Sequence, residues 1–337
     1  MRTYSRRMLV GSGVAVLAGA ALSRHARAAE FSYKLGHSTP NSHPFHIRME
    51  EAAANIGRDS KGRMELTIFP NSQLGGDNDL LSQARSGAIE FCQPTGQILA
   101  SILPVTAINA MGFAFSDYKQ VWPAMDGELG KFVRAQITAK VGLVPMERMW
   151  DLGFRQITTS NKQIKTADDL VGVKLRTPIA PSLVSLFKAL KANPVGMQYG
   201  EVYSALQTRS VDGQENPLSQ IEAGKFYEVQ KYCSISNHVW DGHWICANAS
   251  AWGRLPADLQ EIVARNLNEG AQRQRDDLAK LDQTLQGTLQ SKGLVFNAAD
   301  TATFRDQLRS AGFYKEWREK LGEDAWVLLE KQVGKLG

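Results

Sequence analysis

A long segment without proline near the C-terminal end constrains the fold more than any other part of the chain. Between Pro256 and Lys292, apolar residues recur at helical spacing and no proline interrupts them. A helix of this length would span roughly 50 Å, which is longer than one small domain is wide. We therefore expect it to lie across two domains, and Gly270 is where a bend would occur.

Short strands and helices alternate through the remainder of the chain. This alternation predicts an α/β fold, and the absence of a low-complexity linker indicates two interwoven domains. The first domain is predicted to contain residues 29–152 with about 241–275, and the second to contain 153–240 with about 276–337. The strands are predicted near 31–36, 64–68, 89–92, 143–150, 154–159, 171–177, 232–236, 244–247 and 294–296. Helices are predicted from 44, 77, 117, 181, 201, 256, 300 and 314.

The N-terminal residues 1–28 have the pattern of an export signal. Arg6 and Arg7 precede an apolar run from Met8 to Leu22, and Ala26-Arg27-Ala28 is a small-residue cleavage site. The run is too short to span a bilayer as a helix, although an uncleaved membrane anchor is the alternative. We expect a twin-arginine signal peptide, cleavage near Ala28, and a mature periplasmic chain that does not insert into the membrane.

Removing the signal changes the interpretation of the charge. The whole chain has 39 Lys and Arg against 34 Asp and Glu, but residues 1–28 hold five arginines and no acidic residue. The mature chain is therefore formally neutral, and its composition gives no support for nucleic-acid binding.

The chain has three cysteines, Cys92, Cys233 and Cys246. This count is not a disulfide framework, and the sequence leaves open whether Cys233 and Cys246 pair or stay free.

Arg176 closes a predicted strand in a position suited to ligand binding. Val171, Val173 and Leu175 alternate with polar residues, and Pro178 then ends the strand because it lacks an N–H. Ligands of open α/β sheets bind beyond such strand ends, and a guanidinium there can grip a carboxylate with two hydrogen bonds. The alternative is a solvent-exposed face, which Arg176 would share with Lys174.

Four motifs occur in the order typical of one family. FPNSQLGGD (69–77) resembles a "P-x-s-Q-L-G" segment, and VGVKLR (171–176) resembles a "G-x-K-x-R" strand. YSALQ (203–207) followed by VDGQENP (211–217) resembles "Y-x-A-L-Q-x-G-x-v-D-G-x-E-n-P", and WGRLP (252–256) resembles "W-x-x-L-P". The chain therefore resembles the substrate-binding proteins of TRAP transporters, of the DctP type. Arg209 departs from the pattern, because many members have glycine there.

The resemblance implies a periplasmic-binding-protein-like fold in which two α/β domains close on a small organic anion. It implies that Arg176 clamps the carboxylate, that Arg155 in GFRQIT (153–158) is a second arginine, and that Asn216 supports the same group. It also implies that the loaded receptor docks on a membrane permease of small and large subunits, driven by a sodium gradient. No cofactor is implied, although a cation can accompany the acid in some members.

Other polar and aromatic residues are candidates for the cleft wall. Trp150 and Trp240 could cover an aliphatic chain or stack on a ring, and Asp241 could hold a hydroxyl. The alternative for the tryptophans, Trp244 included, is the hydrophobic core. The remaining candidates, on position alone, are His37, Thr95, Gln97 and His238.

Two other functional classes are weighed against a receptor of organic acids. A metal-binding receptor would use His37, His43 and His46, or His238 with His243, but no matching carboxylate or cysteine set accompanies them. A periplasmic enzyme is not supported, because the chain has no G-x-S-x-G, H-E-x-x-H or P-loop motif. The sequence does not choose between a dicarboxylate and a monocarboxylate with a hydroxyl or ring, and it leaves the oligomeric state open.

Overall fold

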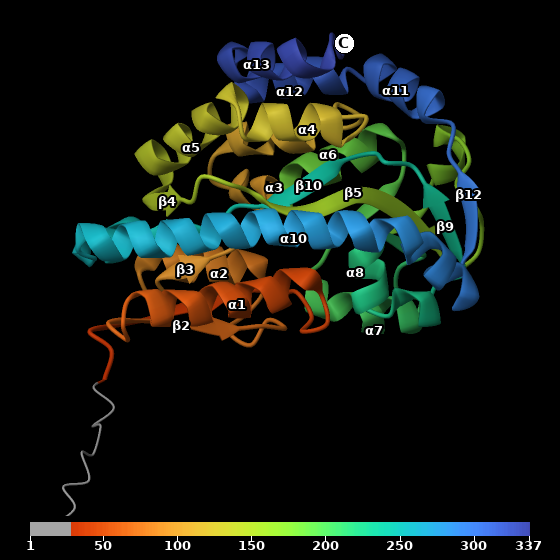
Figure 1. The fold of residues 1–337 in the computed structure, drawn as a ribbon. Helices are drawn as coiled ribbons and strands as arrows, with labels where there is room; N and C mark the ends of the chain where they lie inside the picture. Colours follow the sequence, from red (N-terminus) through yellow and green to blue (C-terminus); the bar gives the residue numbers. More distant parts are fainter. Residues whose placement is uncertain (1–27) are drawn as a thin grey trace, which may run out of the picture.

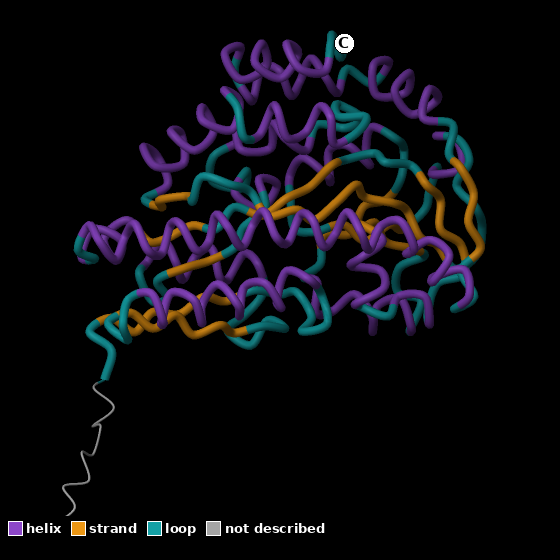
Figure 2. Tube along the Cα trace, in the orientation of Figure 1, coloured by secondary structure: helices purple, strands orange, loops and turns teal. Residues whose placement is uncertain are grey.

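The computed structural model describes residues 28–337, so the predicted signal peptide lies outside the described residues except for Ala28. Two β-sheets form the framework (Figures 1 and 2). The first sheet has the strand order β2-β1-β3-β11-β4. Its strands are β1 (Phe31–Gly36), β2 (Met64–Phe69), β3 (Phe91–Cys92), β4 (Leu143–Pro145) and β11 (Cys246–Asn248).

The second sheet has the order β12-β9-β5-β8-β6-β7, and β10 pairs with β5 beside it. Its strands are β5 (Trp150–Thr159), β6 (Lys174–Thr177), β7 (Asn193–Gly196), β8 (Gly213–Pro217), β9 (Tyr232–Ile235), β10 (Trp240–His243) and β12 (Val295–Ala298). Both sheets are mixed. β1 runs parallel to β2 and β3, and β6 runs parallel to β7 and β8, whereas β5 is antiparallel to β8 and β9.

Helices cover the two sheets and form the C-terminal end of the chain. α11, α12 and α13 pack along the edge formed by α4, α5 and α6 (Figure 1). The helices are α1 (Pro44–Asp59), α2 (Asp77–Ser86), α3 (Gly96–Leu99), α4 (Tyr118–Met125), α5 (Glu128–Val141), α6 (Pro181–Ala189), α7 (Val202–Gln207), α8 (Leu218–Ala223), α9 (Ala249–Arg254), α10 (Ala257–Ser291), α11 (Thr301–Ser310), α12 (Phe313–Leu321) and α13 (Glu323–Val333).

The long helix α10 crosses the width of the molecule, as the sequence predicted (Figure 1). It packs on α1 beside the first sheet. Further along, it packs on β5 of the second sheet and on α8. Gly270 lets the ring of Trp150 approach the helix, because a Cβ built there would lie 3.0 Å from that ring. The Gln274 side chain exchanges two hydrogen bonds with the backbone of Asp151, at 2.8 and 2.9 Å. These contacts fix α10 to the start of β5.

The predicted alternation of strands and helices is confirmed, with differences in detail. The helix expected from Asp117 is divided into α4 and α5, because the chain leaves helical geometry at Gly127. The strands β7, β8 and β10 were not predicted, since their sequences lack an alternating apolar pattern. Within residues 28–337, no helix has both the length and the apolar composition needed to cross a bilayer.

The cysteines are placed differently from the pairing considered above. Cys246 in β11 lies directly opposite Cys92 in β3, within the first sheet. Cys233 belongs to β9 in the second sheet. All three are buried and free, so the pairing of Cys233 with Cys246 is wrong and the free-thiol alternative holds.

Candidate functional site

A cavity lies where strands of both sheets end. Ser38 and Thr39 follow β1, Asp77 begins α2, and Thr95 precedes α3, and all four line one side. The other side is lined from the second sheet by Arg155, Arg176, Pro178, Tyr199, Asn216 and Gln220. Because β1, β3, β6 and β8 all point their carboxyl ends here, the cavity occupies the position where α/β sheets bind ligands.

Arg176 reaches the cavity from the penultimate position of β6 and is 2% exposed. Its Nε and Nη2 atoms both donate to the carbonyl oxygen of Met197, at 3.1 and 2.6 Å, which fixes the plane of the guanidinium. Within residues 28–337, Nη1 is buried and has no hydrogen-bond partner. Burial lowers the pKa of Arg176 to about 10, against the opposing charge of Glu215. The group therefore remains cationic at neutral pH and has an N–H group available for an anion.

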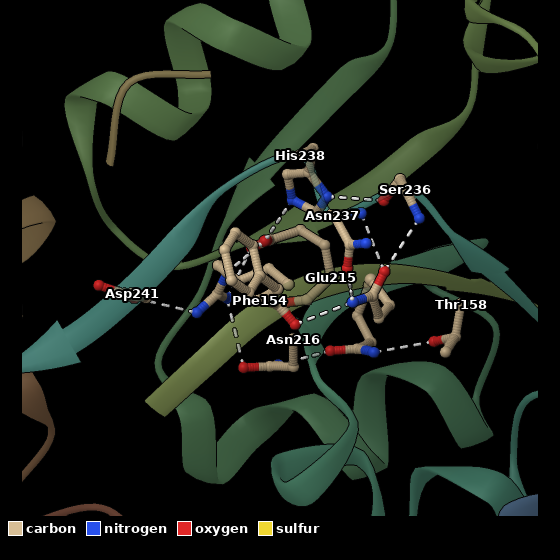
Figure 3. A network of polar contacts seen from close by, with 11 residues as sticks. Phe154, Thr158, Glu215, Asn216, Ser236, Asn237, His238 and Asp241 are labelled. Atoms are coloured by element: carbon tan, nitrogen blue, oxygen red, sulfur yellow. Dashed lines mark hydrogen bonds and ion pairs between the residues drawn. The ribbon is translucent and has the colours of Figure 1, made fainter. Parts of the chain in front are cut away.

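Arg155 is held in a buried network of charged groups, and Figure 3 labels its partners Glu215 and Asp241 together with His238. Its Nη2 atom donates to Glu215 Oε1 at 2.8 Å, and its Nε atom donates to Oε2 of the same carboxylate. Its Nη1 atom donates to Asp241 Oδ2 at 3.2 Å, while His238 Nε2 lies 3.0 Å from Glu215 Oε2. Burial opposes ionisation of Glu215, but Arg155 and His238 hold its pKa below the usual value.

Asp241 belongs to the same network, but its pKa is raised, whereas that of Glu215 is lowered. Burial raises the pKa of Asp241 to about 7, because the attraction of Arg155 does not offset the loss of water and the nearby charge of Glu215 adds to the shift. Its Oδ1 atom accepts from the backbone N–H of Gly242 at 3.0 Å. Asp241 therefore changes its charge near neutral pH, within a cavity that also contains Arg176.

Asn216 connects Arg155 to Gln214 by hydrogen bonds. Its Oδ1 atom accepts from Arg155 Nη2 at 3.3 Å, and its Nδ2 atom donates to Gln214 Oε1 at 2.5 Å. Gln214 in turn donates to Thr158 Oγ1 at 2.8 Å. This chain of hydrogen bonds follows from the antiparallel register of β5 and β8, which places Arg155 opposite Pro217 and Thr158 opposite Gln214.

Asp77 and two neutral side chains add hydrogen-bonding groups to the cavity wall. Asp77 Oδ1 accepts from Ser38 Oγ at 2.7 Å and from Gln93 Nε2 at 3.2 Å, and burial raises the pKa of this carboxyl. Gln220 Oε1 and both ring nitrogens of His243 are buried without partners among residues 28–337. Burial lowers the pKa of His243 to about 3, so its ring is neutral.

The cavity brings together five of the candidates from the sequence, which are Arg155, Arg176, Asn216, Asp241 and Thr95. The other candidates lie outside its lining. Trp150 packs on Phe45 and Trp240 on Phe115 and Trp122, both in the core. His37 contacts His46 and Phe45, Gln97 is buried in α3, and His238 contacts Glu215. A ligand role for these residues stays a prediction that their position does not favour.

Several residues of the site were not proposed from the sequence. Glu215 is not part of the cavity lining but pairs with Arg155, and the available signal was its acidic side chain inside the VDGQENP motif. Asp77 also lay in a quoted motif, at the start of a helix where an acidic residue is common for another reason. Tyr199 and Gln220 carried no signal, because only tertiary packing turns them to the cavity.

Comparisons with known proteins decide the family. The sequence profile described as "Bacterial extracellular solute-binding protein, family 7" (DctP) matches residues 35–320. The chain belongs to the DctP family. The 2,3-diketo-L-gulonate-binding periplasmic protein YiaO of Escherichia coli is 30% identical over 290 residues, which cover 86% of this chain and 88% of YiaO.

Solved structures of TRAP solute-binding proteins agree with this DctP assignment. A protein from Sulfurospirillum deleyianum with bound succinate superimposes with a TM-score of 0.84 at 28% identity, covering 90% of this chain and 99% of its own. One from Roseobacter denitrificans with bound L-galactonate has a TM-score of 0.83 at 29% identity, covering 89% and 99%. The predicted two-domain, periplasmic-binding-protein-like α/β fold with a long helix is confirmed, while the domain boundaries stay a prediction.

Membership of the DctP family also bears on the rival functions. Proteins of this family are solute receptors, which confirms that the chain is not an enzyme. His37, His43 and His46 lie close together near His243, with His37 Nε2 lying 3.2 Å from His46 Nδ1. Within residues 28–337, no three or more His, Cys, Asp or Glu side chains are grouped as metal ligands.

Proposed function

We propose that the chain is the periplasmic receptor of a TRAP transporter and binds a small organic acid through Arg176. The observation that carries this proposal is the Nη1 atom of Arg176, which is buried in the cavity without a partner among the described residues. A buried guanidinium with an unpaired N–H group gains charge-assisted hydrogen bonds from a carboxylate, whereas an exposed pair contributes at most about 1 kcal/mol. The relatives named above bind acids, which supports the same ligand class.

The remaining parts of the proposal follow from the family. Arg155 is the second arginine for the carboxylate and Asn216 supports the same group; both line the cavity with Arg176, and Arg155 can turn one N–H of Nη1 toward the acid. The twin-arginine signal directs the chain to the periplasm, where cleavage near Ala28 releases it. The loaded receptor then delivers the acid to a permease of small and large membrane subunits, and no cofactor takes part.

A thermal-shift screen tests the ligand class. Organic acids and their primary amides are compared with and without EDTA, because a ligand at 100 times its Kd adds about 2.7 kcal/mol to the free energy of unfolding. We expect stabilisation by an acid and none by its amide. Equal stabilisation by both, or a response to metal ions that EDTA removes, would overturn the proposal.

Variants of Arg176 test whether this residue is responsible for the stabilisation by the acid. Arg176→Ala and Arg176→Gln should abolish the stabilisation, and the Gln variant keeps a donor for the Met197 carbonyl in case the Ala variant unfolds. Arg58→Ala is the matched control, since it removes one positive charge from an exposed position on α1. Near-normal affinity in a folded Arg176→Gln variant would show that another residue holds the acid.

A further inference from the structure

We propose that the site selects a monocarboxylate with hydroxyls along its chain over a dicarboxylate of the same length. This rests on the proposed function, because it takes the acid on Arg176 as given. Membership of the family does not decide the matter, since one relative has bound succinate and another L-galactonate. The difference has to come from the groups that surround Arg176 in this chain.

The charged groups around the cavity favour a ligand with a single carboxylate. Arg155 is the second cation of the wall, but Glu215 and Asp241 accept hydrogen bonds from all three of its nitrogens and offset its charge, which leaves one N–H of Nη1 for the acid already on Arg176. Asp77 adds another carboxyl group on the opposite wall. A second carboxylate on the ligand would therefore meet carboxyl groups rather than a free cation, and burial makes that repulsion costly.

The neutral groups of the wall require partners that both donate and accept. Gln220 Oε1 is a buried acceptor without a donor among the described residues, and Gln220 is 4% exposed. Both nitrogens of the neutral His243 ring are without partners, so the ring can donate one hydrogen bond and accept another. Asp77 and Asp241 can accept further hydrogen bonds. Hydroxyl groups on the ligand can form hydrogen bonds with these side chains, whereas the methylene groups of a dicarboxylate would leave them without partners.

An amino acid is the competing ligand, because its ammonium group could meet the same carboxyl groups. Two observations favour hydroxyls. The Gln220 and His243 side chains of the wall are neutral, and burial raises the pKa of Asp241 to about 7. An ammonium group has no acceptor to offer to His243. Ile98, Leu152 and Pro178 also line the cavity, and they suit the carbon chain of either ligand.

Calorimetry with ligands of matched length tests the selection on the exported protein. The four-carbon set is D-erythronate, butyrate, succinate and 4-aminobutyrate, and the six-carbon set is galactonate, hexanoate, adipate and 6-aminohexanoate. We expect the hydroxylated acid of one set to bind at least about tenfold more tightly than the others of that set. If succinate, adipate or an amino acid equals it, the selection is overturned, while the receptor proposal stands as long as Arg176→Gln abolishes that binding. If no acid in either set binds, both proposals fail.

A variant of Gln220 separates recognition of hydroxyls from support of the fold. Gln220→Leu keeps the size of the side chain and removes the acceptor, so affinity for the hydroxylated acid should fall about tenfold. Affinity for butyrate or hexanoate should not fall. An equal loss for hydroxylated and plain acids would assign Gln220 a structural role and overturn its part in selection, whereas Arg176→Gln should weaken both.

Discussion

Arg155 and Arg176 line the same cavity, but the protein's own carboxylates pair only with Arg155. The Arg155 guanidinium donates to Glu215 and Asp241, whereas Arg176 donates only to the carbonyl of Met197 and leaves Nη1 without a partner in the described part of the chain. Both side chains are 2% exposed, so a difference in solvent exposure does not explain why carboxylates pair only with Arg155. The pair therefore divides two tasks: Arg155 organises the wall, and Arg176 is available to an incoming anion.

The geometry of Arg176 predicts that its charge alone is insufficient. Arg176→Lys keeps a cation, but an ammonium group cannot contact the Met197 carbonyl and a ligand carboxylate with the same planar arrangement. We expect the affinity for the acid to fall by about tenfold to a hundredfold, which is roughly 1.4–2.8 kcal/mol. Isothermal titration measures the loss. Unchanged affinity would mean that a point charge is enough and that the fork geometry is irrelevant.

The Arg155–Glu215 pair predicts a large effect on stability. Glu215→Gln leaves the Arg155 cation buried with only Asp241 as its carboxylate partner, and breaking such a pair costs about 3–5 kcal/mol. Urea unfolding measures the change. The control is Glu316→Gln, which breaks the half-exposed pair with Lys320 and should cost less than about 1 kcal/mol. Similar costs for the two variants would show that the buried network adds no stability.

The sequence located the clamp because its residues lie on strands that pair with one another. Gln156, beside Arg155, lies opposite Asn216, and Arg176 lies beside Gln214. Motifs that are separate in the sequence therefore meet in one sheet. Arg209, the departure from the family pattern, has a φ of 57°. This left-handed geometry explains why glycine is common there, and arginine retains the turn at a cost in strain.

The rest of the site depends on packing that a single sequence does not encode locally. The clusters around Trp150 and Trp240 combine an aromatic and an acidic residue, which fits a cleft or a core equally well. The structure places both tryptophans in the core because Gly270 and Phe115 supply surfaces for them. Gln220 lines the cavity from α8, and His243 lines it from the end of β10. No spacing rule connects positions that become neighbours through tertiary contacts.

His43 predicts a defined dependence of stability on pH. Its ring accepts a hydrogen bond from the Phe45 N–H at the start of α1, and burial lowers its pKa to about 3. The unfolded chain binds a proton near pH 6.5 while the folded chain does not, so this group destabilises the protein as pH falls below 6.5. His43→Asn keeps an acceptor at the helix start and does not titrate. We expect the free energy of unfolding of the original protein, relative to this variant, to fall by about 2 kcal/mol from pH 7 to pH 5. A constant difference across this range would contradict the low pKa.

Two glycines in α10 predict opposite effects of the same substitution. Gly287 is exposed and a Cβ there meets nothing within 4 Å, so Gly287→Ala should stabilise the helix by about 0.5–1 kcal/mol. Gly270 is buried, and a Cβ there would lie 3.0 Å from the Trp150 ring and 3.3 Å from Ala52. Trp150 begins β5 and is fixed by the bonds of its neighbour Asp151 to Gln274, so the ring cannot withdraw freely. Gly270→Ala should therefore destabilise the protein despite the better helix propensity of alanine. Urea unfolding of the two variants decides the matter, because stabilisation by both would show that the contact of α10 with Trp150 does not require glycine.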